Sequence, residues 1–121
     1  MLDGWSIDAA KRMVSVKFSG HLVFADLQAY IAGLLASPDF DPTFSELVDL
    51  AAVNSTELNY GKSAVLSEWA DPYALSSRRA FVVVSEAVHH VVRMYQTLRG
   101  DSGGIRVFSR PEDAREWLQG P

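Results

Sequence analysis

The chain has 121 residues, of which 48% are hydrophobic and 21% charged, with a formal net charge of −4 and no cysteine. This length suits one domain, residues 1–121, with a single core, and the lack of cysteine excludes disulfides, thiol catalysis, zinc–thiolate sites and iron–sulfur clusters. The acidic balance argues against nucleic acid, whose phosphates select basic surfaces, and the lack of a signal peptide or of about 18 consecutive apolar residues predicts a soluble, cytoplasmic protein without a membrane span.

The first third of the chain predicts a β-hairpin followed by a helix. Residues 4–7 and 13–18 are the two strands, and the second alternates apolar with polar side chains, as a half-buried strand does. Residues 19–21 are expected to end that strand. Residues 23–36 carry apolar side chains at helical spacing and stop before Pro38.

The middle of the chain predicts a strand and a second helix. Residues 44–50 form an apolar, buried strand that ends in Val48-Asp49-Leu50. Asn54 and Glu57 resemble a capping pair at the start of a helix. That helix is expected to end before Asp71-Pro72.

The last third predicts two strands, each followed by a helix. Residues 79–84 are continuously apolar after Arg79, as in a central strand covered on both faces. The helix that follows is expected to end at Gly100 as its C-terminal cap. A short strand, residues 105–108, leads to Ser109 and Glu112, which resemble a capping pair at the start of the final helix.

This order of elements, ββαβαβαβα, predicts the fold class. Strands that alternate with helices pair in parallel through right-handed crossovers. We therefore expect a layered α/β domain with a five-stranded mixed, mostly parallel sheet, an N-terminal hairpin and four helices.

Several short segments carry a family resemblance that spans nearly the whole chain. They are Phe18-Ser19-Gly20, Leu47-Val48-Asp49-Leu50, Arg79-Ala80-Phe81-Val82-Val83, Arg93-Met94-Tyr95, Val107-Phe108 and Ala114-x-x-Trp117-Leu118. In these segments the chain resembles the STAS domain of anti-anti-sigma factors and, more closely, the SpoIIAA-like group of small bacterial proteins with a STAS/SEC14-like architecture. The resemblance implies a regulatory module that acts by binding another protein, and its SEC14-like side implies a lipid-like ligand by analogy.

The chain departs from the anti-anti-sigma pattern after the third strand. Those factors carry an Asp-Ser-Ser-Gly-like turn whose serine is phosphorylated by a partner kinase, whereas this chain has Glu57-Leu58-Asn59 at that position. Ser55 and Thr56 lie just before it. A phosphoserine switch is therefore not carried over by position, and phosphorylation of Ser55 or Thr56 stays an open question.

Other motifs give no catalytic set. Gly61-Lys62-Ser63 lacks the first glycine of a phosphate-binding loop and falls inside a helical pattern. Glu86 and His89, with His90 beside them, have a spacing used by metal sites in helical bundles, but the only other histidine is His21, in a distant part of the chain. No Gly-x-Ser-x-Gly occurs. The sequence therefore predicts no catalytic residue, metal or cofactor; an enzyme that uses Asp49 with His21 or His90 has no spacing in its favour.

The ends of the predicted parallel strands form the candidate binding edge. Asp49 lies near the end of an apolar strand, where it either accepts hydrogen bonds from residues 54–56 or offers a polar group to a ligand. Helix N-termini at such an edge also present free N–H groups to anions or partners. The candidate edge consists of Asp49, Asn54, Ser55, Thr56, Glu57, Ser85 and Ser109.

The first predicted helix carries more apolar surface than one sheet face requires. Tyr30 and Leu35 broaden its apolar stripe, and the loop that follows contains Phe40 and Phe44. Such a surplus indicates either a dimer contact or an apolar pocket. The first hypothesis is therefore a non-enzymatic module that binds another protein or a second copy of itself. The alternative is a carrier or sensor of a small apolar or lipid-like ligand held between the helices and the sheet.

Charge is spread unevenly along the chain. Residues 1–77 contain four basic and ten acidic side chains, whereas residues 78–121 contain seven arginines and five acidic side chains. This division is typical of a solvated surface, and also of a chain that steers a charged partner or its own copy.

Overall fold

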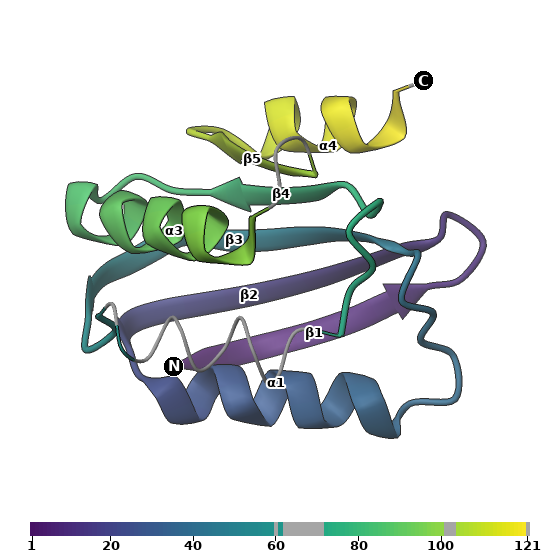
Figure 1. The fold of residues 1–121 in the computed structure, drawn as a ribbon, viewed down its shortest axis with the longest axis horizontal. Helices are drawn as coiled ribbons and strands as arrows, with labels where there is room; N and C mark the ends of the chain where they lie inside the picture. Colours follow the sequence, from purple (N-terminus) through teal and green to yellow (C-terminus); the bar gives the residue numbers. More distant parts are fainter. Residues whose placement is uncertain (60, 62–71, 101–103, 121) are drawn as a thin grey trace.

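The computed structural model describes residues 1–59, 61, 72–100 and 104–120, which form an α/β fold around a five-stranded sheet (Figure 1). The strands lie side by side in chain order: β1 (Leu2–Asp8), β2 (Met13–Leu22), β3 (Ser45–Thr56), β4 (Arg79–Val82) and β5 (Ile105–Phe108). β1 pairs with β2 in antiparallel fashion, and the other three pairs are parallel. The predicted mixed, mostly parallel sheet with an N-terminal hairpin is confirmed.

The described helices are α1 (Phe24–Ala36), α3 (Glu86–Arg99) and α4 (Pro111–Gln119). Most of the helix predicted between the third and fourth strands falls on residues 60 and 62–71, which lie outside the described residues, and Leu58, which was expected in it, is not helical. None of the described helices is long and apolar enough to cross a membrane.

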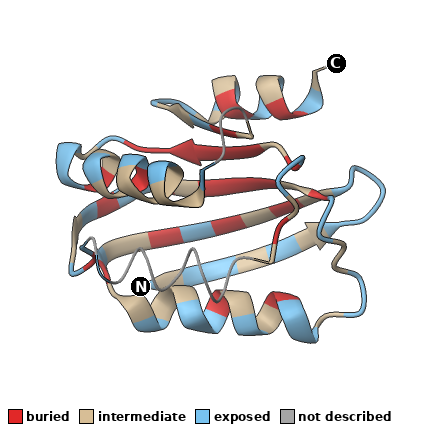
Figure 2. Ribbon diagram, viewed as in Figure 1, coloured by how far each residue is buried: buried red, intermediate tan, exposed pale blue. Residues whose placement is uncertain are grey.

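The sheet has two differently covered faces. α1 and α3 pack on one face, here called the front, where Val48 of β3 and Phe81 of β4 belong to the larger core. α4 packs on the opposite face, the back, where Ala114 and Leu118 meet Leu47, Ala80 and Val82. Because successive side chains of a strand point to opposite faces, neighbouring residues of β3 and of β4 belong to different cores. All four residues of β4 are buried, as predicted for a central strand covered on both faces (Figure 2).

β2 continues through residues 19–21, which were expected to end it. Two register shifts against β3, one between Lys17 and Ser19 and one between Gly20 and His21, let the strand bend and continue to Leu22. Gly20 has a φ of 66°, a left-handed conformation that glycine adopts without steric cost. Glycine therefore bends this strand instead of stopping it.

β3 is also longer than predicted, running to Thr56 rather than to Leu50. Its second half pairs with the extended end of β2, with Ser55 opposite His21. Asn54 therefore belongs to a strand, and the prediction that Asn54 and Glu57 cap the next helix is wrong. The capping pattern is local, whereas the pairing that overrides it comes from a strand more than 30 residues earlier.

The predicted helix ends are partly confirmed. α3 ends at Gly100, which has a φ of 71° as a left-handed C-terminal cap. α4 begins at Pro111 with Arg110 as its N-cap residue, and no side chain bonds to that cap. Ser109 is therefore not the cap, because the proline occupies the first helical position one residue after Arg110.

Gly33, inside α1, leaves room for the side chain of Trp5. The ring of Trp5, on the front face of β1, lies so close to Gly33 that a Cβ atom there would be 2.6 Å from Trp5 Cζ2. The same ring meets Tyr30 edge-on, with 6.1 Å between ring centroids. The absence of a side chain at Gly33 thus lets the hairpin approach the helix.

Candidate functional site: an apolar cavity with a buried charged pair

The residues of the predicted binding edge do not lie together. Asp49 pairs with Val82 at the end of β4, whereas Ser55 pairs with His21 near the end of β2. At about 3.3 Å per residue, these two side chains are roughly 20 Å apart along β3. Ser109 directly follows β5, and Ser85 is the N-cap residue of α3 without a side-chain cap bond. The edge is divided because β2 and β3 extend well past β4 and β5.

Asp49 lies on the back face of β3 and is half-buried. Its Oδ1 accepts a hydrogen bond from the backbone N–H of Ala51 at 3.0 Å. The carboxylate is therefore held by its own strand, and the prediction that residues 54–56 hold it is wrong.

The end of β3 is tied to β2 by side chains. His21 Nδ1 and Ser55 Oγ are 2.8 Å apart, and Ser55 Oγ donates to Asn54 Oδ1 at 3.4 Å. Thr56 Oγ1 donates to the carbonyl of Leu22 at 2.9 Å and accepts from the N–H of Leu58 at 3.1 Å. These contacts assign a structural role to the hydroxyls of Ser55 and Thr56.

Glu57 supports a different helix from the one predicted. Its Oε2 accepts a hydrogen bond from the N–H of Phe24, the first residue of α1, at 3.1 Å. The N-terminus of a helix has unsatisfied N–H groups and a partial positive charge, so a carboxylate there is favourable. Asp26 acts nearby, accepting from the N–H of Val23 at 3.1 Å.

The histidines do not gather with acidic residues. Glu86 and His90 of α3 are exposed and His89 is half-buried, while His21 bonds to Ser55 on another element. Among the described residues, no group of three or more His, Cys, Asp and Glu side chains could hold a metal ion. The three histidines are therefore separate surface or structural groups.

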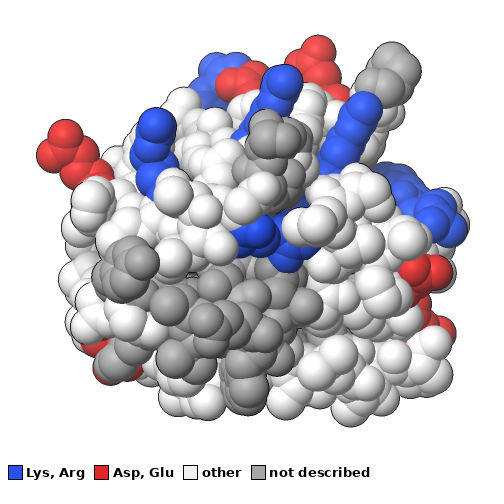
Figure 3. Space-filling view, viewed as in Figure 1, with Lys and Arg blue, Asp and Glu red and all other residues white. Residues whose placement is uncertain are grey.

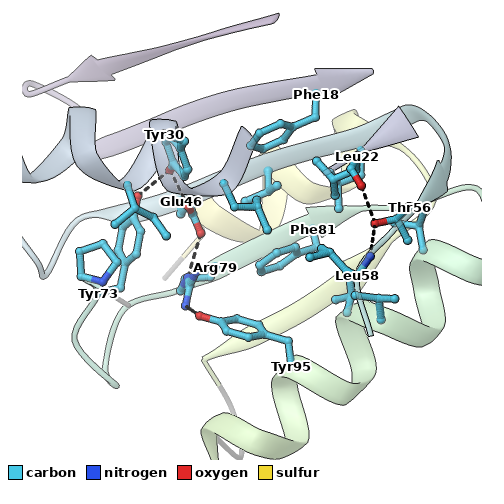
Figure 4. A pocket seen from close by; sticks show the side chains of 18 residues that line it. Phe18, Leu22, Tyr30, Glu46, Thr56, Leu58, Tyr73, Arg79, Phe81 and Tyr95 are labelled. Carbon is cyan, nitrogen blue, oxygen red and sulfur yellow. Dashed lines mark hydrogen bonds and ion pairs between the residues drawn. The ribbon is translucent and has the colours of Figure 1, made fainter. Parts of the chain in front are cut away.

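The front face instead contains an apolar cavity of about 90 Å³ between α1, α3 and the sheet (Figure 4). Both helices and the central strands contribute to its wall. Its apolar lining includes Phe18, Leu27, Ile31, Val48, Phe81 and Val91, and its polar lining consists of Tyr30, Glu46, Thr56, Tyr73, Arg79 and Tyr95.

A buried ion pair forms part of this lining. Glu46 of β3 and Arg79 of β4 are direct neighbours in the parallel register, and Arg79 Nε donates to Glu46 Oε1 at 2.8 Å. Their side chains are only 1% and 6% exposed. A charge buried this deeply is tolerated only when it is paired and hydrogen-bonded.

Three tyrosines complete the network (Figure 4). Tyr30 Oη donates to Glu46 Oε2 at 2.5 Å and lies 3.0 Å from Tyr73 Oη. Arg79 Nη1 donates to Tyr95 Oη at 3.0 Å, and its guanidinium lies 4.6 Å from the centre of the Tyr73 ring. Both carboxylate oxygens of Glu46 are thus engaged, one by an arginine and one by a tyrosine.

Burial sets the protonation states of this network. Removal from water, with the nearby Glu46 carboxylate, raises the pKa of Tyr30 well above its usual value and also raises that of Tyr73. Burial alone would lower the pKa of Arg79, but the charge interactions and hydrogen bonds with Glu46 and Tyr95 together outweigh burial, so the pKa is raised. At neutral pH the hydroxyls of Tyr30 and Tyr73 are therefore protonated, and Arg79 is a cation.

Sequence reasoning missed this pair, although a signal was present. Arg79 is the one charged residue of the predicted strand 79–84, whereas the predicted strand 44–50 carries Glu46 and Asp49, three positions apart and therefore on opposite faces. A charge at an inward position requires a partner of opposite sign. Neighbouring strands that place an acid and a base on the same inward face therefore favour an ion pair across the ladder.

The surplus apolar side chains of α1 and of the loop after it differ in burial. Tyr30 is buried against the sheet, where its hydroxyl bonds to Glu46. Phe44 is buried, and Phe40 packs edge-on against Tyr73 with 5.3 Å between ring centroids. Leu35 alone of these four is exposed, at 66%. Most of the predicted surplus is therefore core and cavity wall.

No protein-family model and no curated protein matches this chain. The cavity offers apolar contacts, tyrosine hydroxyls and an ion pair whose charges compensate each other. This arrangement is suited to holding an uncharged molecule.

Proposed function

We propose that this protein is a non-enzymatic binding module that holds a small, neutral, largely apolar molecule between α1, α3 and the sheet. The observation that carries the proposal is the cavity of about 90 Å³ with a mainly apolar wall. Apolar cavities of about 150 Å³ stay dry and bind benzene. At about 90 Å³ this cavity is smaller, so it would accept the end of a short chain, and a single ring only with a slight displacement of its wall.

The buried pair supports a ligand without net charge. Because Glu46 and Arg79 neutralise each other, a charged ligand would find no free counter-charge and would lose its hydration on entry. The hydroxyls of Tyr30 and Tyr95 lie among the polar lining. A ligand with one hydroxyl or carbonyl group would suit this side of the cavity.

The likeness to the SpoIIAA-like, STAS/SEC14-like group is part of the same proposal. Its support is the element order, with an antiparallel hairpin followed by parallel strands and intervening helices. The SEC14-like side of that likeness agrees with a carrier or sensor of a lipid-like ligand, by analogy only.

A pair of matched variants tests the proposal. Val91→Phe adds bulk to the cavity wall, whereas Val84→Phe adds the same ring type at a position that is 68% exposed. We expect 1-hexanol and benzene to cause saturable changes in the amide NMR spectrum of the wild type and of Val84→Phe, with affinity at least tenfold lower for Val91→Phe. Equal affinity for all three proteins, or no saturation at the solubility limit, would overturn the proposal. Native mass spectrometry of protein purified from cells then looks for a co-purifying apolar molecule.

The other predicted function is binding of a protein partner at the edge that includes Glu57. The variant that tests it must leave α1 undisturbed. Glu57→Lys would remove the acceptor of the Phe24 N–H and disturb α1 as well as any partner surface. Glu57→Gln removes the charge and keeps an acceptor oxygen. Loss of partner binding in Glu57→Gln would therefore support this function, and binding equal to wild type would count against it.

The charged surface was also predicted to steer a charged partner or a second copy of the chain. On the face shown in Figure 3, most basic side chains lie over α3, β5 and α4, with acidic side chains among them. This mixture lacks the single sign that long-range steering requires. Sedimentation velocity at increasing concentration tests whether a second copy binds.

A further inference from the structure

The described helices cover only part of the back face of the sheet. α4 packs over β3, β4 and β5, and no other described helix lies over β1 and β2 on this side (Figure 1). Between α4 and the uncovered strands lies a groove of about 330 Å³, close to the lower limit of pockets that hold small ligands. The polar side chains in its lining are Ser6, Ser15, Lys17, Asp49 and Arg115.

The strand register brings these groups together from four elements. Ser6 of β1 lies opposite Ser15 of β2, and Lys17 of β2 lies beside Asp49 of β3. Arg115 is contributed by α4. A groove built from three strands and a helix holds its polar groups at set positions, unlike charges scattered on a convex surface.

Most of these side chains have no hydrogen bond or ion pair within the described part of the chain. This holds for Ser6, Ser15, Lys17 and Arg115. Asp49 uses Oδ1 to accept from the Ala51 N–H. Donors therefore dominate the groove, with a single carboxylate beside them.

The charges of the groove indicate the class of ligand that it would bind. Two cations and one carboxylate make the groove net positive, although the whole chain has a net charge of −4. Arginine presents a planar fork that matches carboxylate and phosphate oxygens, while lysine adds a point charge. Asp49 accepts hydrogen bonds. Its negative charge would repel an anionic ligand unless a hydrogen-bond donor of that ligand lies next to Asp49.

We propose that this groove is a second binding site, for a small organic anion whose carboxylate or phosphate contacts Lys17 and Arg115 and whose hydroxyl or ammonium group contacts Asp49. The site is independent of the apolar cavity, because the sheet separates the two. In β3 the groove residue Asp49 follows the cavity residue Val48 directly, on the opposite face.

Titrations of the whole protein with matched probes test this site by amide NMR at constant ionic strength. L-malate and succinate differ by one hydroxyl, and glycerol 3-phosphate carries one phosphate and two hydroxyls in place of carboxylates. We expect L-malate or glycerol 3-phosphate to cause saturable shifts around Ser6, Ser15, Lys17 and Asp49, with succinate binding more weakly. If L-malate binds more tightly than glycerol 3-phosphate, the preferred group is a carboxylate. If glycerol 3-phosphate binds more tightly, the preferred group is a phosphate.

Variants separate a site from general charge attraction. Lys17→Gln and Arg115→Gln should each weaken binding at least tenfold, whereas Lys11→Gln, in the exposed turn between β1 and β2, should leave it unchanged. Asp49→Asn retains an acceptor for Ala51 but replaces the carboxylate by a neutral amide, so it should reduce the preference for L-malate over succinate. Non-saturating shifts, shifts spread over the other arginines, or equal loss in Lys11→Gln would overturn the proposal. Because the three basic side chains are exposed, these variants are expected to fold, and an unchanged unfolding midpoint checks this.

Discussion

Replacement of Glu46 by methionine should destabilise the protein more than most single substitutions. Glu46→Met keeps an unbranched side chain but leaves the Arg79 guanidinium, whose side chain is 6% exposed, without its counter-charge. Removal of one partner of a buried ion pair typically costs about 3–5 kcal/mol. Since small domains have unfolding free energies of about 5–15 kcal/mol, this loss is a large part of the total and corresponds to a melting temperature roughly 12–20 °C lower.

Urea unfolding followed by circular dichroism measures this loss, and a double-mutant cycle gives its cause. Arg79→Met should also be strongly destabilising, whereas Glu46→Met with Arg79→Met should be no less stable than either single variant, because no charge is then buried alone. Asp49→Asn, in the same strand but on the opposite face, serves as the control and should change stability by about 0.5 kcal/mol or less. A loss under about 1 kcal/mol for Glu46→Met, or a double variant as unstable as the sum of the singles, would refute the reasoning.

Three further predictions concern protonation, packing and capping. The pKa values of Tyr30 and Tyr73 are raised in the folded state, so their contribution to stability is complete below about pH 10 and is lost as pH rises above it. The free energy of unfolding should then fall by roughly 3 kcal/mol per pH unit for the pair, and tyrosinate absorbance from both in the folded protein near pH 10 would contradict this. Gly33→Ala should cost about 1 kcal/mol, because contact with Trp5 outweighs the gain in helix propensity; calorimetry that shows stabilisation would contradict it. Glu57→Ala should lose about 1 kcal/mol of stability through the lost helix cap, whereas Glu57→Gln should lose less, and equal losses in denaturant melts would count against capping.

Local patterns were sufficient for much of the fold. Alternation at residues 14–18 predicted a half-buried strand, and these residues lie in β2 with Val14, Val16 and Phe18 buried. A glycine after an amphipathic run predicted the end of α3 at Gly100. Each of these signals lies within a few residues of the structure it predicts, so backbone preference and hydrophobic periodicity are enough to find it.

The candidate site depends on contacts between distant segments. Glu57 contacts Phe24, 33 residues earlier in the chain. Glu46 contacts Arg79, 33 residues later. No local pattern contains the partner of such a residue, which explains why the capping role assigned to Asn54 and Glu57 was wrong and why the buried pair was not singled out.

By itself, the sequence determined an α/β order of elements, a cysteine-free chain and a central strand too apolar to face water. Only the tertiary structure decided which face each helix covers, how far β2 and β3 extend together, and which charged side chains are neutralised inside the core. The physical reason is that periodicity specifies which side of an element is apolar, whereas pairing and burial are decided by the segment that packs against it.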